Sequence, residues 1–137
     1  MNKEVFDRGI AIRKEVLGKE FVENSLKNAT DFNMPMQELT TEYCWGYVWG
    51  REGLPKKTRS MLNIAMLSAL GRNHELGMHV KGALVNGVSR DEIKEILLQT
   101  AIYCGVPSAN SAFKTAQQVF HSMDDAAMDE AETDKNP

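Results

Sequence analysis

The chain of 137 residues lacks the features that mark several common functional classes. No apolar stretch approaches the roughly 20 residues that cross a bilayer. The N-terminus has no basic-then-apolar run of the kind found in signal peptides. Cys44 and Cys104 lie far apart in the sequence, so there is no Cys-x-x-Cys redox motif. We therefore expect a cytoplasmic protein with no membrane partner and two free, buried thiols.

Charge of one sign is concentrated in only one region, the C-terminus. Residues 124–137 hold six of the 19 acidic side chains and one of the 16 basic ones, so residues 1–123 are mildly positive, with 13 acidic and 15 basic residues. No basic cluster follows a helix face, and aromatic residues do not alternate with Arg and Lys. Nucleic acid is therefore not an expected partner, whereas a small anionic ligand fits the mild positive bias.

The hydrophobic pattern predicts helices and offers no competing strand pattern. We expect an all-α, single-domain bundle of about six helices over residues 1–123, followed by an acidic, disordered tail over 124–137. The helix over 55–70 is apolar nearly all round and should be central and buried. Ser89 and Glu92 form a capping-box pattern before another helix. The predicted helices cover about 2–26, 35–49, 55–70, 73–86, 90–105 and 107–120.

Glu75 and His79 lie four residues apart on one predicted helix face. A carboxylate near an imidazole can raise the imidazole pKa and prepare a proton donor or acceptor. The same spacing is common in surface ion pairs, and that interpretation stays open. A zinc site is not expected, because His74 and His79 are five residues apart and diverge by about 140° on a helix.

Arg59 stands in the first turns of the apolar helix, where a guanidinium needs an anionic partner. That partner is either a protein carboxylate, such as Glu42 or Glu75, or a substrate carboxylate. Trp45 and Trp49 either wall a pocket or belong to the core or a subunit interface.

Three segments of the chain are distinctive: WGYVWGREGL (45–54), TRSMLNIAMLSAL (58–70) and HELGMHVKGALVNGVSRDEIKEILLQTAIYCGVPSANSAF (74–113). Together they resemble the carboxymuconolactone decarboxylase family. The resemblance extends from about Val5 to Phe120, and the pattern from His79 to Ile93 is typical of the wider alkyl-hydroperoxidase D-like superfamily. Its disulfide reductases carry Cys-x-x-Cys where this chain has Arg72 and Glu75, which argues against a peroxidase-linked activity.

The resemblance implies an alkyl-hydroperoxidase D-like helical fold and a homo-oligomer, commonly a hexamer built as a trimer of dimers. It also implies a cofactor-independent decarboxylase that acts on a dicarboxylate lactone in protocatechuate breakdown. For such a reaction we hypothesise that His79 delivers a proton, Glu75 orients it or relays the proton, and Arg59 anchors a carboxylate or stabilises an oxyanion. Glu42, Trp45 and Trp49 complete the expected binding site, which needs no metal.

Two other functions remain open at the level of sequence. The same residues would serve a related lactone decarboxylase or isomerase. Alternatively, the chain is a non-catalytic oligomeric binding protein in which the Glu75 and His79 pair is structural. A buried pair in a closed pocket favours an enzyme, and a solvent-exposed pair favours the binding protein.

Overall fold

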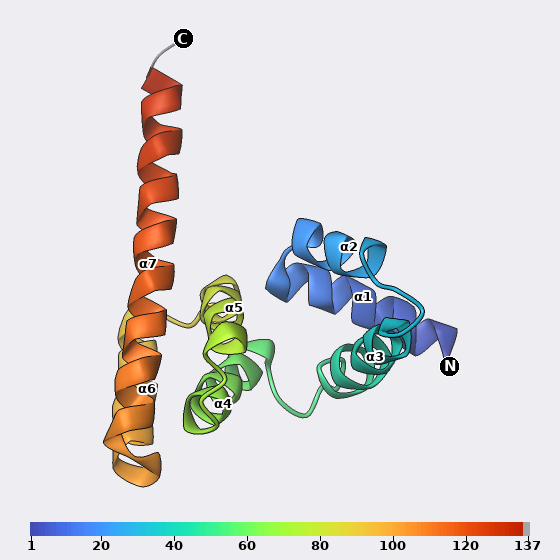
Figure 1. Ribbon diagram of the computed structural model, residues 1–137, viewed down its shortest axis with the longest axis horizontal. Coiled ribbons are helices and arrows are strands. Elements are labelled where there is room, and N and C mark those ends of the chain that lie inside the picture. The colour runs from blue at the N-terminus through green and yellow to red at the C-terminus, as the bar shows by residue number, and fades with distance from the viewer. Residues whose placement is uncertain (136–137) are drawn as a thin grey trace.

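Residues 1–135 are described by a computed structural model, and they form helices joined by short loops (Figure 1). No β-strand occurs in this range, which confirms the predicted all-α class. No helix in residues 1–135 combines the length and apolar character that a membrane crossing requires. In chain order the elements are α1 (Lys3–Leu17), α2 (Lys19–Lys27), α3 (Met34–Leu39), the π-helix η1 (Thr40–Val48), α4 (Lys56–Ala69), α5 (Asn73–Val85), α6 (Arg90–Cys104) and α7 (Val106–Lys135).

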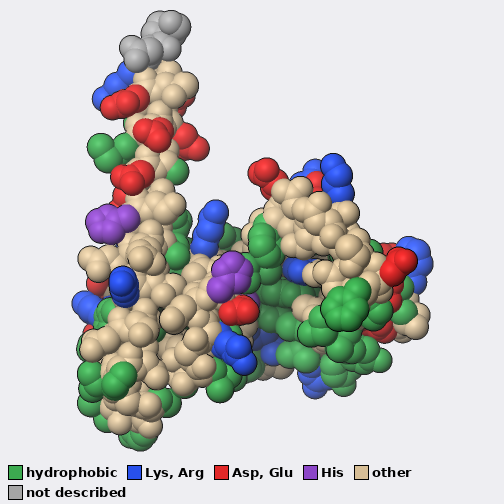
Figure 2. All heavy atoms as spheres, in the orientation of Figure 1, with side chains coloured by type: hydrophobic (Ala, Val, Ile, Leu, Met, Phe, Trp, Pro, Cys, Tyr) green, Lys and Arg blue, Asp and Glu red, His purple; other side chains and the backbone are tan. Residues whose placement is uncertain are grey.

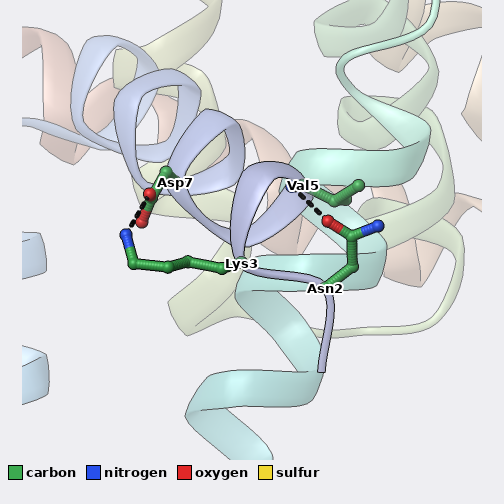
Figure 3. Close-up of polar contacts among 4 residues, drawn as sticks. All are labelled: Asn2, Lys3, Val5 and Asp7. Atoms are coloured by element: carbon green, nitrogen blue, oxygen red, sulfur yellow. Dashed lines mark hydrogen bonds and ion pairs between the residues drawn. The ribbon is translucent and has the colours of Figure 1, made fainter.

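The first predicted helix is two helices. α1 begins at an Asn2 cap, whose side-chain oxygen accepts a hydrogen bond from the Val5 amide at 3.1 Å (Figure 3). An exposed Lys3–Asp7 ion pair of 2.7 Å follows in the first turns. Gly18 then takes φ +98°, a conformation that side chains with a Cβ avoid, and ends α1 before α2 starts. The single helix expected over 2–26 was therefore wrong at this residue.

α1 and η1 pack with their backbones in close contact. A methyl group added to Gly9 would overlap the carbonyl oxygen of Thr41, and one added to Gly46 would overlap the carbonyl oxygen of Val5. The two helices can approach this closely only because glycine occupies both contact points. Between them a small core of Ile12, Val16, Trp45 and Trp49 forms.

The second half of the chain has its own core, built from α4 to α7. α6 starts at the predicted capping box, in which the Ser89 hydroxyl accepts from the Glu92 amide and the Glu92 carboxylate accepts from the Ser89 amide, both at 3.0 Å. The two halves meet where α1 packs on α5, and Gly82 there leaves room for Val16. The fully or nearly buried side chains of the second core are Ile64, Leu76, Val80, Ala83, Val88, Ile93, Leu97, Ala112 and Ala116.

Two further expectations about burial were wrong. α4 buries one face, through Ser60, Ile64 and Ser68, but leaves Leu62 46% and Met66 52% exposed. Its contacts with α5, α6 and α7 account for the inner face, and no element within residues 1–135 covers the outer one. Both cysteines are free in this part of the chain, as expected, but their residues are exposed rather than buried.

The acidic segment is helical as far as Lys135, contrary to the expected disorder, and residues 136–137 lie outside the described range. α7 extends well beyond the body of the molecule, with acidic side chains along the extension (Figures 1 and 2). Ala, Met and Glu favour helix, and the packed part of α7 already provides the costly first turns. A bidentate Arg90–Asp124 ion pair at 2.7 and 3.1 Å joins the start of α6 to the beginning of this extension.

The contact between α1 and η1 can be tested with Gly9→Ala. The added methyl group must push the two backbones apart, so we expect the free energy of unfolding to fall by about 1–3 kcal/mol in urea titrations. The matched control is Gly77→Ala in α5, where the nearest atoms would be Thr115 Cγ2 at 3.6 Å and Val119 Cγ2 at 3.7 Å. That variant should keep or gain stability, by about 0.5–1 kcal/mol. Equal losses in both variants would contradict the close contact.

Candidate active site

The π-helix η1 presents two indole rings on its buried side. Buried and exposed residues alternate in pairs along η1, with Trp45 3% and Trp49 5% exposed. The amide of Trp49 donates to the carbonyl of Cys44 at 3.0 Å, an i to i+5 hydrogen bond. The indole rings stack with centroids 4.9 Å apart and planes 25° apart. Since π-helical turns are rare and are frequent at functional sites, this segment is a candidate part of the site.

His79 lies against this indole pair from α5. Its ring is parallel to that of Trp45, with 1° between the planes and 6.0 Å between centroids, and lies 6.4 Å from the Trp49 centroid. Leu76, which precedes His79 in the sequence, and Val80, which follows it, are buried and fix α5 in the core. The half-buried imidazole therefore lies at the junction between the two cores of the molecule.

α4 contributes a polar residue that sequence analysis did not single out. The side-chain nitrogen of Asn63 lies 3.5 Å from Nδ1 of His79. Asn63 comes four residues after Arg59, so the two share one face of α4. The available signal was a polar residue inside the apolar run MLNIAML, one turn after a charged residue.

The guanidinium of Arg59 is only partly satisfied by the protein. Nη2 donates to the carbonyl oxygen of Arg51 at 3.3 Å, whereas the buried Nε has no hydrogen-bond partner in residues 1–135. No carboxylate of this range lies within ion-pair distance of Arg59. A buried donor without an acceptor is costly, and its presence is a reason to look for a ligand.

Glu42 does not pair with Arg59, contrary to one of the two expected arrangements. Its side chain is 8% exposed, and Oε1 accepts a hydrogen bond from the backbone amide of Asn2 at 2.8 Å. The carboxylate therefore lies at the N-terminus of α1, where the helix dipole favours negative charge. This contact stabilises the packing of α1 on η1.

Glu75 is exposed on α5, one turn before the half-buried His79. The pair is therefore neither buried, as expected for the enzyme, nor wholly exposed, as expected for the binding protein. Burial of the imidazole lowers the pKa of His79 below its ordinary value, and the negative charge of Glu75 opposes this shift without overcoming it. His79 is therefore mainly neutral at pH 7 in the free protein. Within residues 1–135, no three His, Cys, Asp or Glu side chains gather as metal ligands would.

The site thus combines two indoles, a neutral imidazole and a cation that has no carboxylate partner in residues 1–135. Such a set can hold a small anion and exchange a proton with it. A separate groove of about 810 Å³ lies between α4 and α6, and Met61, Leu62 and Tyr103 are among its lining residues. None of Arg59, Asn63 or His79 lines that groove.

Known proteins resemble this chain over most of its length. Residues 35–118 match the model of the carboxymuconolactone decarboxylase family. The chain is 44% identical over 124 residues to the 4-carboxymuconolactone decarboxylase of Acinetobacter baylyi, covering 90% of this chain and 92% of that protein. It is 46% identical over 125 residues to the nitrosuccinic acid decarboxylase of Metarhizium robertsii, covering 91% and 87%. The matched range contains every residue of the site described above.

The influence of Glu75 on the imidazole can be measured directly with Glu75→Gln. Removal of the negative charge leaves the lowering effect of burial unopposed, so the pKa of His79 should fall further. Proton NMR titration of the three histidines measures this shift, and a His79→Gln sample assigns the resonance. Glu20→Gln on the exposed part of α2 is the control and should leave the titration unchanged. An unchanged or higher pKa in Glu75→Gln would exclude the electrostatic contact.

Proposed function

The chain belongs to the carboxymuconolactone decarboxylase family, and from that premise we propose that it decarboxylates 4-carboxymuconolactone to 3-oxoadipate enol-lactone. The proposal rests mainly on the half-buried His79, which lies between the indole pair and Asn63. Nearby on α4, Arg59 has no carboxylate partner in residues 1–135. A dicarboxylate lactone would supply the missing negative charge. The reaction requires no cofactor, because the substrate itself accepts the electron pair.

The electron pair moves within the substrate. The bond between the ring carbon and its carboxylate breaks, and the pair passes through the conjugated C=C bond to the lactone carbonyl oxygen. Carbon dioxide leaves, and a furanolate-type dienolate remains. Protonation of the ring carbon next to the carbonyl then completes the product. The protein therefore has to anchor the second carboxylate, stabilise the oxyanion and supply one proton.

His79 is the proposed proton donor. Its ring is mainly neutral in the free site, but the charge of a bound dianion raises an imidazole pKa and favours proton uptake from solvent. The protonated ring can then give its proton to the dienolate carbon. Glu75, one turn earlier on α5, is the residue proposed to orient the ring or relay the proton, and the influence of its charge on His79 supports this assignment.

Arg59 is the proposed anion anchor, since its Nε lacks an acceptor within residues 1–135. A guanidinium binds a carboxylate in a fixed geometry and also stabilises a developing oxyanion. Trp45 and Trp49 form an apolar wall, which favours the conversion of a charged carboxylate into neutral carbon dioxide. Glu42 supports this wall indirectly, through its contact with α1.

The relative named as a nitrosuccinic acid decarboxylase provides a second candidate substrate class. A nitro group next to the departing carboxylate can accept the electron pair as the lactone does, and the carbon left behind again needs a proton. The same three tasks would fall to the same residues. A related lactone decarboxylase or isomerase and a non-catalytic binding protein are the remaining alternatives.

We also propose that copies of this chain associate through the outer face of α4 and α6, in a homo-oligomer such as a hexamer built as a trimer of dimers. Ile102 is 81% and Tyr103 80% exposed beside the groove, and Leu62 and Met66 continue the apolar surface. Exposed apolar area of this extent is typical of an interface.

Sedimentation equilibrium of the native protein should give a molecular mass that is a multiple of 15.3 kDa. The Ile102→Glu variant should give a lower mass. A monomeric native chain would overturn this proposal.

Turnover of the lactone tests the main proposal. Purified protein should release carbon dioxide from 4-carboxymuconolactone without added metal. The loss of the substrate's ultraviolet absorbance measures the rate of this reaction. His79→Gln should lower kcat by about 100-fold or more with a small change in KM, since it removes the proton donor and leaves the anion anchor. Equal kinetics in the variant would exclude His79 as the donor.

A contrasting variant separates binding from proton transfer. Arg59→Gln should raise KM strongly, because the surviving carboxylate loses its cation. A parallel assay with nitrosuccinate distinguishes the two substrate classes. Turnover of neither compound by a folded protein would direct the search to other lactones or to a binding role.

A further inference from the structure

Asn63 is the neighbour of His79 that distinguishes between its two ring nitrogens. The amide nitrogen of Asn63 is 3.5 Å from Nδ1. The indoles of Trp45 and Trp49 lie together on one side of the ring, with centroids 6.0 and 6.4 Å from it and planes 1° and 24° from its own. The indoles restrict the plane of the imidazole, but they do not select which nitrogen points away from α4. That selection requires a polar contact at the ring edge.

An asparagine can keep this contact through a whole proton-transfer cycle. When the ring is neutral, the side-chain amide donates to Nδ1, and the ring proton resides on Nε2. When the ring is protonated, a rotation of the amide lets its oxygen accept from Nδ1–H. In both states Nε2 carries a proton and remains free of the contact with α4. Transfer of the Nε2 proton to the dienolate carbon leaves the ring proton on Nδ1, where the amide oxygen of Asn63 still accepts it. Proton exchange with solvent then restores the Nε2 tautomer.

We propose that Asn63 is a positioning residue that holds Nε2 of His79 as the nitrogen facing the substrate. This inference rests on the proposed function, in which His79 supplies a proton to the dienolate carbon. Asn63 also ties the two catalytic elements together, because it is one turn from Arg59 on α4 and contacts His79 on α5. The distance between the anion anchor and the proton donor is thereby set by two packed helices.

The charges around the ring define what the test must control. Glu75 precedes His79 by one turn on α5 and is the group whose charge acts on it. From α4 the ring meets the neutral Asn63, with the cation of Arg59 one turn earlier, and from η1 it meets two neutral indoles. Exchange of Asn63 for a neutral group of similar size therefore changes the contact at Nδ1 without altering these charges, whereas a carboxylate there adds one negative charge.

Two variants test the proposal. Asn63→Leu keeps the approximate volume and removes the polar contact, whereas Asn63→Asp offers only acceptor oxygens to Nδ1. Nitrogen NMR of protein labelled with ¹⁵N-histidine reports which ring nitrogen is protonated, and it requires no substrate. Asn24→Leu, at an exposed position of α2, is the control. Circular dichroism establishes that each variant is folded.

We expect the neutral ring of His79 in the native protein to carry its proton on Nε2. In Asn63→Leu the two tautomers should become mixed, with kcat reduced about 10-fold or more and KM little changed. In Asn63→Asp the pKa of His79 should rise, and the alkaline limb of the kcat/KM profile should move to higher pH. An unchanged tautomer in Asn63→Leu, or a native proton on Nδ1, would overturn the proposal.

The two kinds of failure can be told apart. If neither lactone nor nitrosuccinate is turned over while the tautomer depends on Asn63, the positioning role stands and the proposed reaction fails. If turnover depends on His79 but the ring nitrogens do not respond to Asn63, the reaction stands and this inference fails.

Discussion

The close packing of α1 on η1 is the constraint on which the candidate site depends. Gly9 and Gly46 allow the two backbones to touch, and the carboxylate of Glu42 fastens η1 to the N-terminus of α1. The wide turn of η1 then places Trp45 and Trp49 on the side that faces α5. Without that contact the indole pair would not be held against His79, and the imidazole would lose both its apolar surroundings and its fixed plane.

The electrostatic character of the site follows from what surrounds its two ionisable groups. Burial lowers the pKa of His79 by more than the negative charge of Glu75 raises it, so the neutral imidazole is favoured. Arg59, by contrast, remains a cation with an unfilled donor, because carboxylates within residues 1–135 are engaged elsewhere or lie out of reach. In the proposed function, a site that is positive and short of acceptors is organised in advance for an anion, and a bound anion would in turn favour protonation of the imidazole. The same arrangement suits any substrate whose carboxylate leaves behind a delocalised anion.

Local patterns predicted the helices best where their ends carry strong signals. The Ser89 and Glu92 capping box started α6 as expected, because both groups satisfy amides within one turn of chain. Prediction failed at Gly18, where a left-handed φ interrupts a continuous apolar pattern, and at η1, where the pattern of a π-helix resembles that of an α-helix. It failed again at residues 124–135, since composition indicates the absence of a core contact but not whether a helix continues from a packed segment.

The sequence by itself determined the all-α class, the resemblance to the family and the identity of His79, Glu75 and Arg59 as candidates, because these depend on periodicity, short motifs and residue chemistry. Only the tertiary structure decided the partners of those residues. It assigned Glu42 to the N-terminus of α1 rather than to Arg59, and it brought Asn63 to Nδ1 of His79. Such contacts join residues far apart in the chain, and their distances depend on how the helices pack, which no local pattern records.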